Sequence, residues 1–356
     1  MKGYAMPRVF VGMSGGVDSS VAAALLVEQG YDVTGIYMKN WSRDLPGMKC
    51  PWADDLSDAK RVAVRLGIPF EVWDFETDYK KKVVDYMLTE FKKGHTPNPD
   101  IMCNEEIKFK LFYEKAMEKG ADFIATGHYA RVVHRTTGPA LLRAVDENKD
   151  QTYFLYRISD EALGHTLFPI GNMLKPDVKK LAAGKNFHNA YKKESMGVCF
   201  VGEVGIRDFL KEYIDIQPGE IREAETEKVL GMHEGAIFYT IGQRHGLYLN
   251  GNKGEVNTGL PYYVVKKDLA DNILYVSQNL NHSAIWTKEL QLENILMRGE
   301  TPKRISVRLR HRAPLVSARL IDDRIIFDNE IKRPASGQSA VFYNGEVCLG
   351  GGIISY

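Results

Sequence analysis

Cysteine is scarce in this sequence. Its 356 residues include only four, at positions 50, 103, 199 and 348. A secreted domain held together by disulfides would be much richer in cysteine. No two of the four lie within four residues of each other, so the sequence contains neither a CxxC redox motif nor a zinc ribbon. We therefore expect neither a disulfide scaffold nor a metal site.

Long apolar runs are absent as well. No run of about 18 apolar residues occurs, and the start, MKGYAMPRVFVGM, lacks the apolar stretch of a signal peptide. Neither sign of charge prevails, because 47 Lys and Arg residues face 46 Asp and Glu residues, for a net charge of +1. We expect a soluble, cytoplasmic protein that is not basic throughout, although this balance is compatible with a local basic patch.

The first 200 residues alternate between apolar runs and helical patterns. Strands are predicted at 8–13, 31–38, 69–74 and 123–126, and helices at 17–29, 54–66, 78–93 and 107–119. Such alternation is typical of an α/β fold with a parallel sheet covered by helices. From AIFYTIG (236–242) to CLGGGII (348–354) the segments are short, β-branched and punctuated by glycine, which predicts β-rich modules and a barrel or sandwich from about residue 285. The predicted domains are 1–205, 206–280 and 281–356.

A candidate phosphate loop, GMSGGVDSS, occupies residues 12–20 between a predicted strand and a predicted helix. Its glycines let backbone N–H groups approach phosphate oxygens, and the helix N-terminus adds a positive dipole end. Ser14, Ser19 and Ser20 can donate hydroxyl hydrogen bonds, while Asp18 can orient the loop or hold Mg²⁺. Neither GxxxxGK[ST] nor GxGxxG is present. The loop resembles that of the PP-loop ATP pyrophosphatases, which implies ATP cleavage between the α and β phosphates; a plain helix cap is the alternative.

Cys103 follows the segment TPNPD at 96–100. The two prolines predict that Asp100 and Cys103 lie in a rigid loop before a helix that begins near Glu105. A helix dipole and Lys108 would then stabilise a thiolate at Cys103, and Asp100 is placed for proton transfer. The polar surroundings argue against the alternative, a buried packing cysteine.

The sequence pattern says less about the other three cysteines. Cys199 stands between Gly197 and Gly202, where an exposed reactive thiol and a buried strand cysteine are equally compatible with the pattern. Cys50 and Cys348 are assigned to packing.

A family resemblance extends over nearly the whole chain. The motifs that carry it are GMSGGVDSS (12–20), TPNPDIMCN (96–104), IKF (107–109), ATGHYAR (125–131), KDQTYFLYR (149–157), FPIG (168–171), SMGVCF (195–200), YTIGQRHGL (239–247), AVFYNG (340–345) and CLGGG (348–352). Together they resemble the tRNA-specific 2-thiouridylases, which place sulfur on the wobble uridine of tRNA. Glu105 and Glu194 depart from the family, which often has Lys and Asp there; Glu105 would weaken the basic surroundings of Cys103.

The resemblance implies a mechanism. ATP, with Mg²⁺, would adenylate the C2 oxygen of the uridine, and a persulfide on Cys199, received from a sulfur donor protein, would attack C2. Cys103 would then attack the sulfur bridge and leave a Cys103–Cys199 disulfide. A route in which Cys103 instead releases hydrosulfide is equally open. Asp100 is the acid/base candidate.

The resemblance also implies binding residues. The nucleotide would be bound by Gly12, Met13, Ser14, Gly15, Gly16, Val17, Asp18, Ser19, Met38 and Gly127. The anticodon stem-loop of tRNA would be bound by Asn98, Pro99, Asp100, His128, Lys149, Asp150, Gln151, Arg308, Leu309, Arg310 and Gln338. Plain alternatives are a core position for Met38, a structural hydrogen bond for His128, solvent exposure for the polar turn at 149–151, and a turn role for Gln338.

A basic segment supports an RNA partner independently of the resemblance. Residues 301–321 contain six Lys or Arg residues and no acidic residue. In a strand, Arg308, Arg310 and Arg312 would share one face and follow a phosphate backbone. An edge strand protected by its charges is the alternative. A weaker inference is that Lys192 and Lys193 help to bind an acidic sulfur donor protein.

Two other functions stay open at this stage. One is a PP-loop ligase or amidating enzyme that acts on a small molecule, which would need neither Cys103 nor Cys199. The other is a tRNA-binding protein without catalytic activity, in which the phosphate loop serves stability alone. Retention of the loop, Asp100 and both cysteines favours the sulfur-transfer enzyme.

Overall fold

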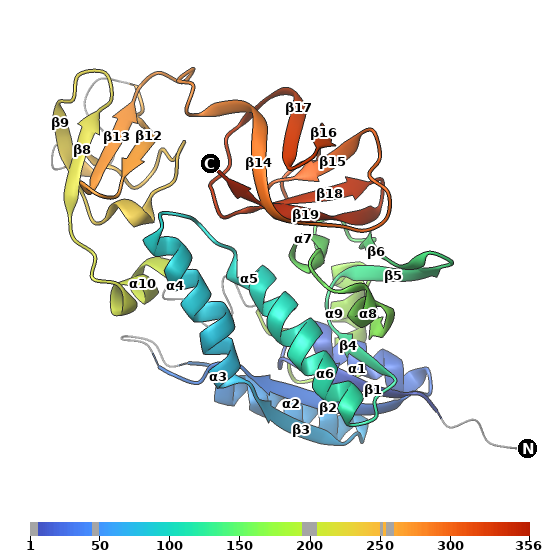
Figure 1. The fold of residues 1–356 in the computed structure, drawn as a ribbon. Helices are drawn as coiled ribbons and strands as arrows, with labels where there is room; N and C mark the ends of the chain where they lie inside the picture. The colour runs from blue at the N-terminus through green and yellow to red at the C-terminus, as the bar shows by residue number, and fades with distance from the viewer. Residues whose placement is uncertain (1–5, 45–49, 194–204, 250–251, 254–259) are drawn as a thin grey trace, which may run out of the picture.

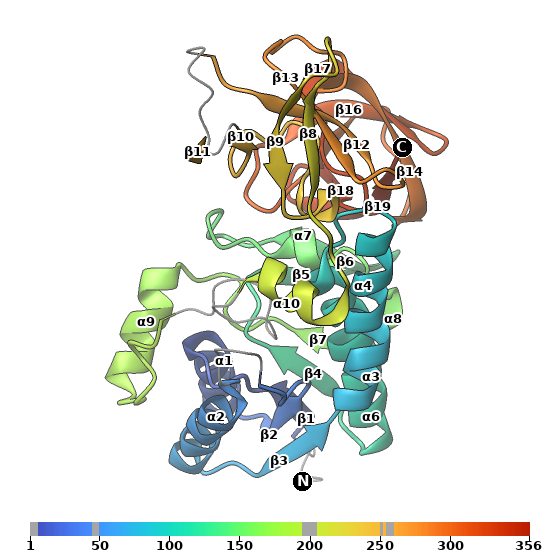
Figure 2. The ribbon, with the colours of Figure 1, turned by 90° about the vertical axis from the view of Figure 1, so that its left-hand side faces the viewer.

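The computed structural model describes residues 6–44, 50–193, 205–249, 252–253 and 260–356. A parallel α/β domain lies at one end of the molecule, and two β-rich units lie side by side at the other (Figures 1 and 2). Within the described residues, no helix is long and apolar enough to cross a membrane.

The α/β domain is built on a five-stranded parallel sheet in the order β3-β2-β1-β4-β7. The strands are β1 (Arg8–Gly12), β2 (Asp32–Lys39), β3 (Phe70–Asp74), β4 (Phe123–Thr126) and β7 (Thr166–Leu167). Successive side chains of a strand point to opposite faces. Accordingly Val9 and Val11 belong to one buried cluster and Phe10 to another. Both faces are therefore covered, as the continuous apolar runs predicted.

Helices cover both faces of this sheet (Figure 2). The α-helices of this domain are α1 (Val17–Glu28), α2 (Trp52–Leu66), α3 (Glu76–Tyr79), α4 (Asp85–Lys92), α5 (Pro99–Met102), α6 (Phe112–Glu118), α7 (Thr152–Leu155), α8 (Asp160–Gly164) and α9 (Lys175–Gly184). Two π-helical segments, η1 (Lys80–Val84) and η2 (Cys103–Leu111), join α3 to α4 and α5 to α6. Each pair therefore forms one long helix with an over-wide middle, a feature that recurs at functional sites.

The central unit follows helix α10 (Ile206–Tyr213) and contains a six-stranded sheet in the order β11-β10-β9-β8-β13-β12. Its strands are β8 (Gly219–Glu223), β9 (Val229–His233), β10 (Tyr248–Leu249), β11 (Asn252–Lys253), β12 (Tyr263–Asp268) and β13 (Ile273–Ser277). The strand expected within 236–242 is wrong. A short 3₁₀ turn, η3 (Ala236–Phe238), stands there, because Gly235 and Gly242 both adopt positive φ and turn the chain.

The C-terminal unit is a closed barrel rather than a sandwich. Its strands are β14 (Trp286–Met297), β15 (Ile305–Arg308), β16 (Val316–Ile321), β17 (Arg324–Lys332), β18 (Ser339–Asn344) and β19 (Val347–Ser355). They follow one another in the order β14-β17-β16-β15-β18-β19, and the antiparallel pairing of β19 with β14 closes the ring. The predicted fold class, a PP-loop α/β domain followed by a β-rich domain and a β-barrel, is confirmed.

The barrel shares its sheet with the α/β domain. A hairpin of the first domain, β5 (Ala130–Arg135) and β6 (Gly138–Arg143), extends the barrel sheet because β6 pairs with β19. Two hydrogen bonds also join the barrel to the loop before α5. Thr96 N donates to the backbone oxygen of Ser336 at 2.8 Å, and the side-chain Nε2 of Gln338 donates to Thr96 O at 2.6 Å. The barrel is thus fixed to the segment that carries Asn98 and Asp100.

Candidate active site

A cavity of about 670 Å³ opens at the carboxyl ends of the central strands. The chain runs from β1 outward to β2 and β3 and then crosses to β4 on the other side of β1, so the strand order reverses between β1 and β4. Ligands of open α/β sheets bind at such a switch point. Gly12, Met38 and Thr126, at or near the ends of β1, β2 and β4, line the cavity.

The phosphate loop forms one wall of this cavity. Of the ten residues predicted to bind the nucleotide, all but Gly15 line it. Ser14 N donates to Ser19 Oγ at 3.1 Å, and Ser19 Oγ and Ser20 Oγ both donate to Gly16 O, at 3.2 and 2.9 Å. These bonds fold the loop tightly over the start of α1, where helix N–H groups and the dipole favour an anion.

Glycine is required at two positions around the loop. Gly15 has a φ of +75°, and an added Cβ would lie 2.3 Å from Asp55 O. A Cβ at Gly127, just after β4, would lie 2.4 Å from Ser19 N. Asn189 Nδ2 donates to Gly15 O at 2.9 Å and to Ser20 Oγ at 3.0 Å, which clamps the loop from behind.

Asp18 is held by two residues from distant parts of the chain. Lys175 Nζ donates to its two carboxylate oxygens at 2.7 and 2.8 Å, and Tyr129 OH donates to Oδ1 at 3.0 Å. The predicted orienting role therefore has a geometric basis. Among the described residues, no group of three or more His, Cys, Asp and Glu side chains could hold a metal ion. A Mg²⁺ ion that arrives with nucleotide phosphates would find one carboxylate in the loop, that of Asp18.

Asp100 and Cys103 lie on the opposite wall, in the helix and not in a loop. The helix begins at Pro99, so the prediction of a start near Glu105 is wrong. Proline fits the first helical position, since the N–H that it lacks has no partner there. Asn98 caps the helix by accepting from Asp100 N at 3.1 Å and Ile101 N at 3.4 Å. Being three residues apart in a helix, Asp100 and Cys103 share one face, and both line the cavity.

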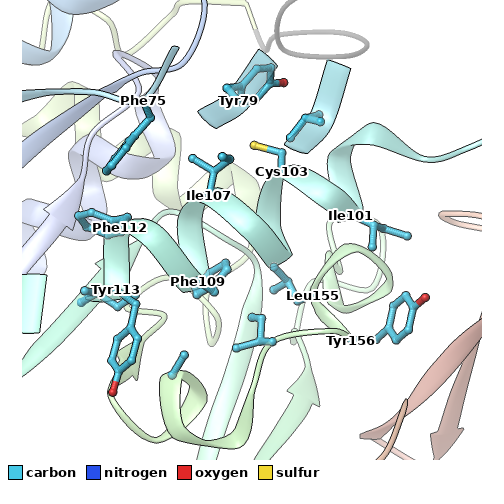
Figure 3. Close-up of a cluster of buried hydrophobic side chains, with 14 of the residues drawn as sticks. Phe75, Tyr79, Ile101, Cys103, Ile107, Phe109, Phe112, Tyr113, Leu155 and Tyr156 are labelled. Atoms are coloured by element: carbon cyan, nitrogen blue, oxygen red, sulfur yellow. The ribbon is translucent and has the colours of Figure 1, made fainter. Parts of the chain in front are cut away.

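Burial, rather than a polar loop, defines the surroundings of Cys103. Its side chain is 3% exposed and lies in an apolar cluster (Figure 3). Figure 3 shows it beside Ile107, on the side of the helix that faces Tyr79. The expectation that polar surroundings exclude burial is therefore wrong. Cys103 is buried and also lines the cavity. This placement is suited to a thiol that is shielded from water until a ligand enters.

Burial shifts the pKa of two ionisable groups, one in this helix and one beside it. Burial raises the pKa of Asp100 above its ordinary value, and the nearby Lys108 ammonium opposes this shift. Burial, together with Lys108, lowers the pKa of His128 well below its usual value. His128 Nδ1 lies 2.8 Å from Thr126 Oγ1, and its ring packs on Phe109. This geometry matches the structural alternative, although His128 also lines the cavity.

Comparison with known proteins assigns the chain to a family. Consecutive family models match it: a tRNA methyl transferase HUP domain over residues 7–203, a tRNA methyl transferase PRC-barrel domain over 207–278, and an aminomethyltransferase beta-barrel domain over 282–354. The tRNA-specific 2-thiouridylase MnmA 2 of Geobacillus kaustophilus (strain HTA426) is 46% identical, covering 98% of this chain and 94% of that protein. MnmA of Bacillus subtilis (strain 168) is 45% identical over the same shares. The chain belongs to the tRNA-specific 2-thiouridylase family.

Two solved structures show a distant similarity to the chain. A 4-thiouridine synthetase in complex with RNA and bound ATP matches 58% of this chain and 50% of its own, with a TM-score of 0.38 and 16% identity. An NMN synthetase from Francisella tularensis matches 54% and 67%, with a TM-score of 0.34 and 18% identity. Both likenesses are too weak to support an argument about the site.

Some residues that the thiouridylase family resemblance assigns to tRNA lie away from the cavity. Lys149 and Gln151 line it, but Asp150 between them is buried and accepts from Arg308 Nη1 at 2.8 Å and from Thr152 Oγ1 at 2.8 Å. Asn98 and Pro99 form the helix start described above, and Gln338 binds the loop before it.

The predicted row of three exposed arginines is wrong. Arg308 is 5% exposed and forms an ion pair with Asp150. Strand β15 ends at Arg308, and Arg312 adopts a φ of +63° in the following turn, so the strand face does not continue. Leu309 is partly buried, whereas Arg310 and Arg312 are exposed, and Arg312 lines the cavity. The turn after β15 therefore carries two exposed cations, Arg310 and Arg312.

Sequence reasoning missed several cavity residues. Phe154 and His311 line the cavity with ring centroids 4.6 Å apart, which brings the barrel into the site. Burial and the cation of Arg312 lower the pKa of His311 to about 4, so its ring is neutral at pH 7. Lys175, which lines the cavity, and Asn189, which holds the phosphate loop, were missed as well. Only the proline after Lys175, a helix-start signal, marked that segment in the sequence.

The predictions for the other cysteines and for Lys192 fare differently from one another. Cys348 is buried in β19, and burial raises its pKa to about 12, in agreement with a packing role. Cys50 is buried too, but it also lines the cavity. Lys192 forms ion pairs with Asp55 and Asp58 at 2.7 and 2.6 Å, which does not favour a donor-docking role. Cys199 lies outside the described residues.

Proposed function

We propose that this protein thiolates C2 of the wobble uridine of tRNA in a reaction driven by ATP. The observation that carries the proposal is that one cavity joins the phosphate loop to a wall bearing both Asp100 and Cys103. A uracil carbonyl is a poor electrophile, and conversion of its oxygen into an AMP ester creates a leaving group. ATP and sulfur chemistry must therefore meet at one base, as this cavity allows.

The proposed reaction has two stages. In the first, the C2 oxygen attacks the α-phosphate of ATP, pyrophosphate leaves, and the uracil N3 proton passes to Asp100 as a base. In the second, the terminal sulfur of a Cys199 persulfide attacks C2 and AMP departs. Cys103 then attacks the sulfur bridge, which forms a Cys103–Cys199 disulfide and releases the thiocarbonyl. The hydrosulfide route uses the same residues.

The residues present suit the two substrates. The loop from Gly12 to Ser19 would hold ATP phosphates with Mg²⁺, and Met38 and Gly127 would flank the nucleotide. An extruded base can be held by its Watson–Crick edge and by stacking. A persulfide carried by a donor protein would load Cys199. We also propose a cytoplasmic location, a division of the chain near residues 205 and 280, and a tRNA-binding role for the barrel, in line with the family-model ranges.

The deciding experiment measures 2-thiouridine in tRNA incubated with the protein, ATP, Mg²⁺ and a persulfide source. We expect the parent to form it, and Cys103→Ser and Cys199→Ser to reduce its formation to background. Cys348→Ala, which removes a buried thiol in the barrel, should retain the parental rate. Parental rates in either serine variant would refute the two-cysteine mechanism. ATP cleavage without tRNA, and no thiouridine, would instead indicate a small-molecule ligase.

A further inference from the structure

The phosphate loop has no cation of its own. Between residues 12 and 20 the only charged side chain is Asp18, which is negative. In nucleotide-cleaving enzymes, charge that develops on the leaving phosphates is usually stabilised by Lys, Arg or a metal ion. The missing charge must therefore come from another part of the chain or from a bound ion.

Lys175 supplies a positive charge at this place. It is the first residue of α9, 157 positions after Asp18. Its side chain is almost wholly buried, and Nζ lies 2.7 and 2.8 Å from the two oxygens of Asp18. The backbone is fixed as well, because Lys175 N donates to Asp146 Oδ2 at 2.9 Å. Taking a lysine out of water is costly unless it is paired, so this placement requires its anionic partner.

Two of the other lysines that line the cavity serve other positions. Lys192 is paired with Asp55 and Asp58 on α2. Lys108 lies beside His128 and near Asp100, on the wall opposite the phosphate loop. Lys175, in contrast, contacts the phosphate loop itself through its side-chain bonds to Asp18, and it lines the cavity.

We propose that Lys175 binds the β-phosphate side of ATP and stabilises the pyrophosphate leaving group, with Asp18 as its partner in the absence of nucleotide. The inference rests on the proposed adenylation. In that step a bond forms between the C2 oxygen and the α-phosphorus, and the bond from the α-phosphorus to the bridging oxygen breaks. Its electron pair goes to pyrophosphate, next to the Lys175 ammonium, whose proton stays in place.

The test is a double-mutant cycle of Lys175→Ala and Asp18→Asn, with Lys175→Arg as a variant that keeps the charge. Pyrophosphate and ATP affinities are measured by calorimetry without tRNA, and pyrophosphate release is measured with tRNA. We expect Lys175→Ala to weaken pyrophosphate binding at least about tenfold and to slow its release about 10²- to 10³-fold. Lys175→Arg should recover part of both, and Lys179→Ala, an exposed lysine of the same helix, should change neither.

The cycle separates binding from a structural role. If Lys175 binds phosphate, its removal must still weaken pyrophosphate binding in the Asp18→Asn background. If it only holds Asp18, both single variants and the double variant will show the same loss, and the proposal is wrong. A parent that binds pyrophosphate through Lys175 but releases none in the presence of tRNA would refute the proposed function instead.

Discussion

At the scale of single residues, Asp100 shows how burial can prepare a base. It stands in the first turn of a helix, lines the cavity, and has a pKa raised by desolvation. A carboxylate that has lost its water is a stronger base, which suits removal of the uracil N3 proton. The nearby Lys108 ammonium opposes this rise in the pKa of Asp100.

Asp100→Asn should lower kcat/KM for tRNA about 10²- to 10⁴-fold, because the variant has no base. In the parent, a raised pKa means that the carboxyl takes up a proton at a higher pH than an ordinary Asp. Activity should therefore fall on acidification through a pKa above about 3.9, and this limb should be missing from the variant. The check is the pH profile of thiouridine formation, with Asp177→Asn, an exposed carboxylate of α9, as the control. Identical profiles for parent and variant would contradict the role.

At the scale of elements, apolar runs located the sheet well. The strand expected at 123–126 is β4 to the residue, and the helix expected at 17–29 is α1 with one residue fewer. Such runs are long, periodic and bounded by glycine, so local pattern decides them. The start of the helix at Pro99 was missed because proline is both a helix breaker and a favoured first residue, and only the Asn98 cap distinguishes the two.

The end of β15 was missed for a different reason. A pattern of alternating arginines predicts one exposed face, but Asp150 from a turn of the α/β domain buries Arg308. Nothing in the local sequence near residue 308 reveals a partner 158 positions away. No local signal in the sequence marks the over-wide turns of η1 and η2 either.

Asp150→Ala should lower the free energy of unfolding by about 3–5 kcal/mol, because it leaves the Arg308 guanidinium buried without its carboxylate. Urea denaturation measures the change. Arg310→Ala, which removes an exposed neighbour, should alter stability by less than about 0.5 kcal/mol. A variant that keeps parental stability but loses tRNA affinity would show that Asp150 contacts RNA rather than the barrel arginine.

At the scale of the whole molecule, the cavity is a product of two domains. Lys175, Phe154 and His311 reach it from α9, α7 and the turn after β15, and no periodicity within one segment links them. Motif resemblance located the phosphate loop and Asp100 because those contacts are local in sequence. The residues that complete the cavity come from pairings that only the assembled chain creates, such as β6 with β19 and Gln338 with Thr96.

This assembly changes which cations should hold tRNA. Arg308 is internal, whereas Arg310 and Arg312 are exposed in the turn that reaches the cavity. Each phosphate contact releases counterions, so Arg310→Gln and Arg312→Gln should each reduce the slope of log affinity against log salt by about 0.7–0.9. Filter-binding titrations of tRNA at several salt concentrations measure this slope. Arg319→Gln, an exposed arginine of β16 that does not line the cavity, is the matched control and should leave the slope unchanged. Equal slopes for the parent and both turn variants would mean that the barrel turn does not contact the RNA backbone.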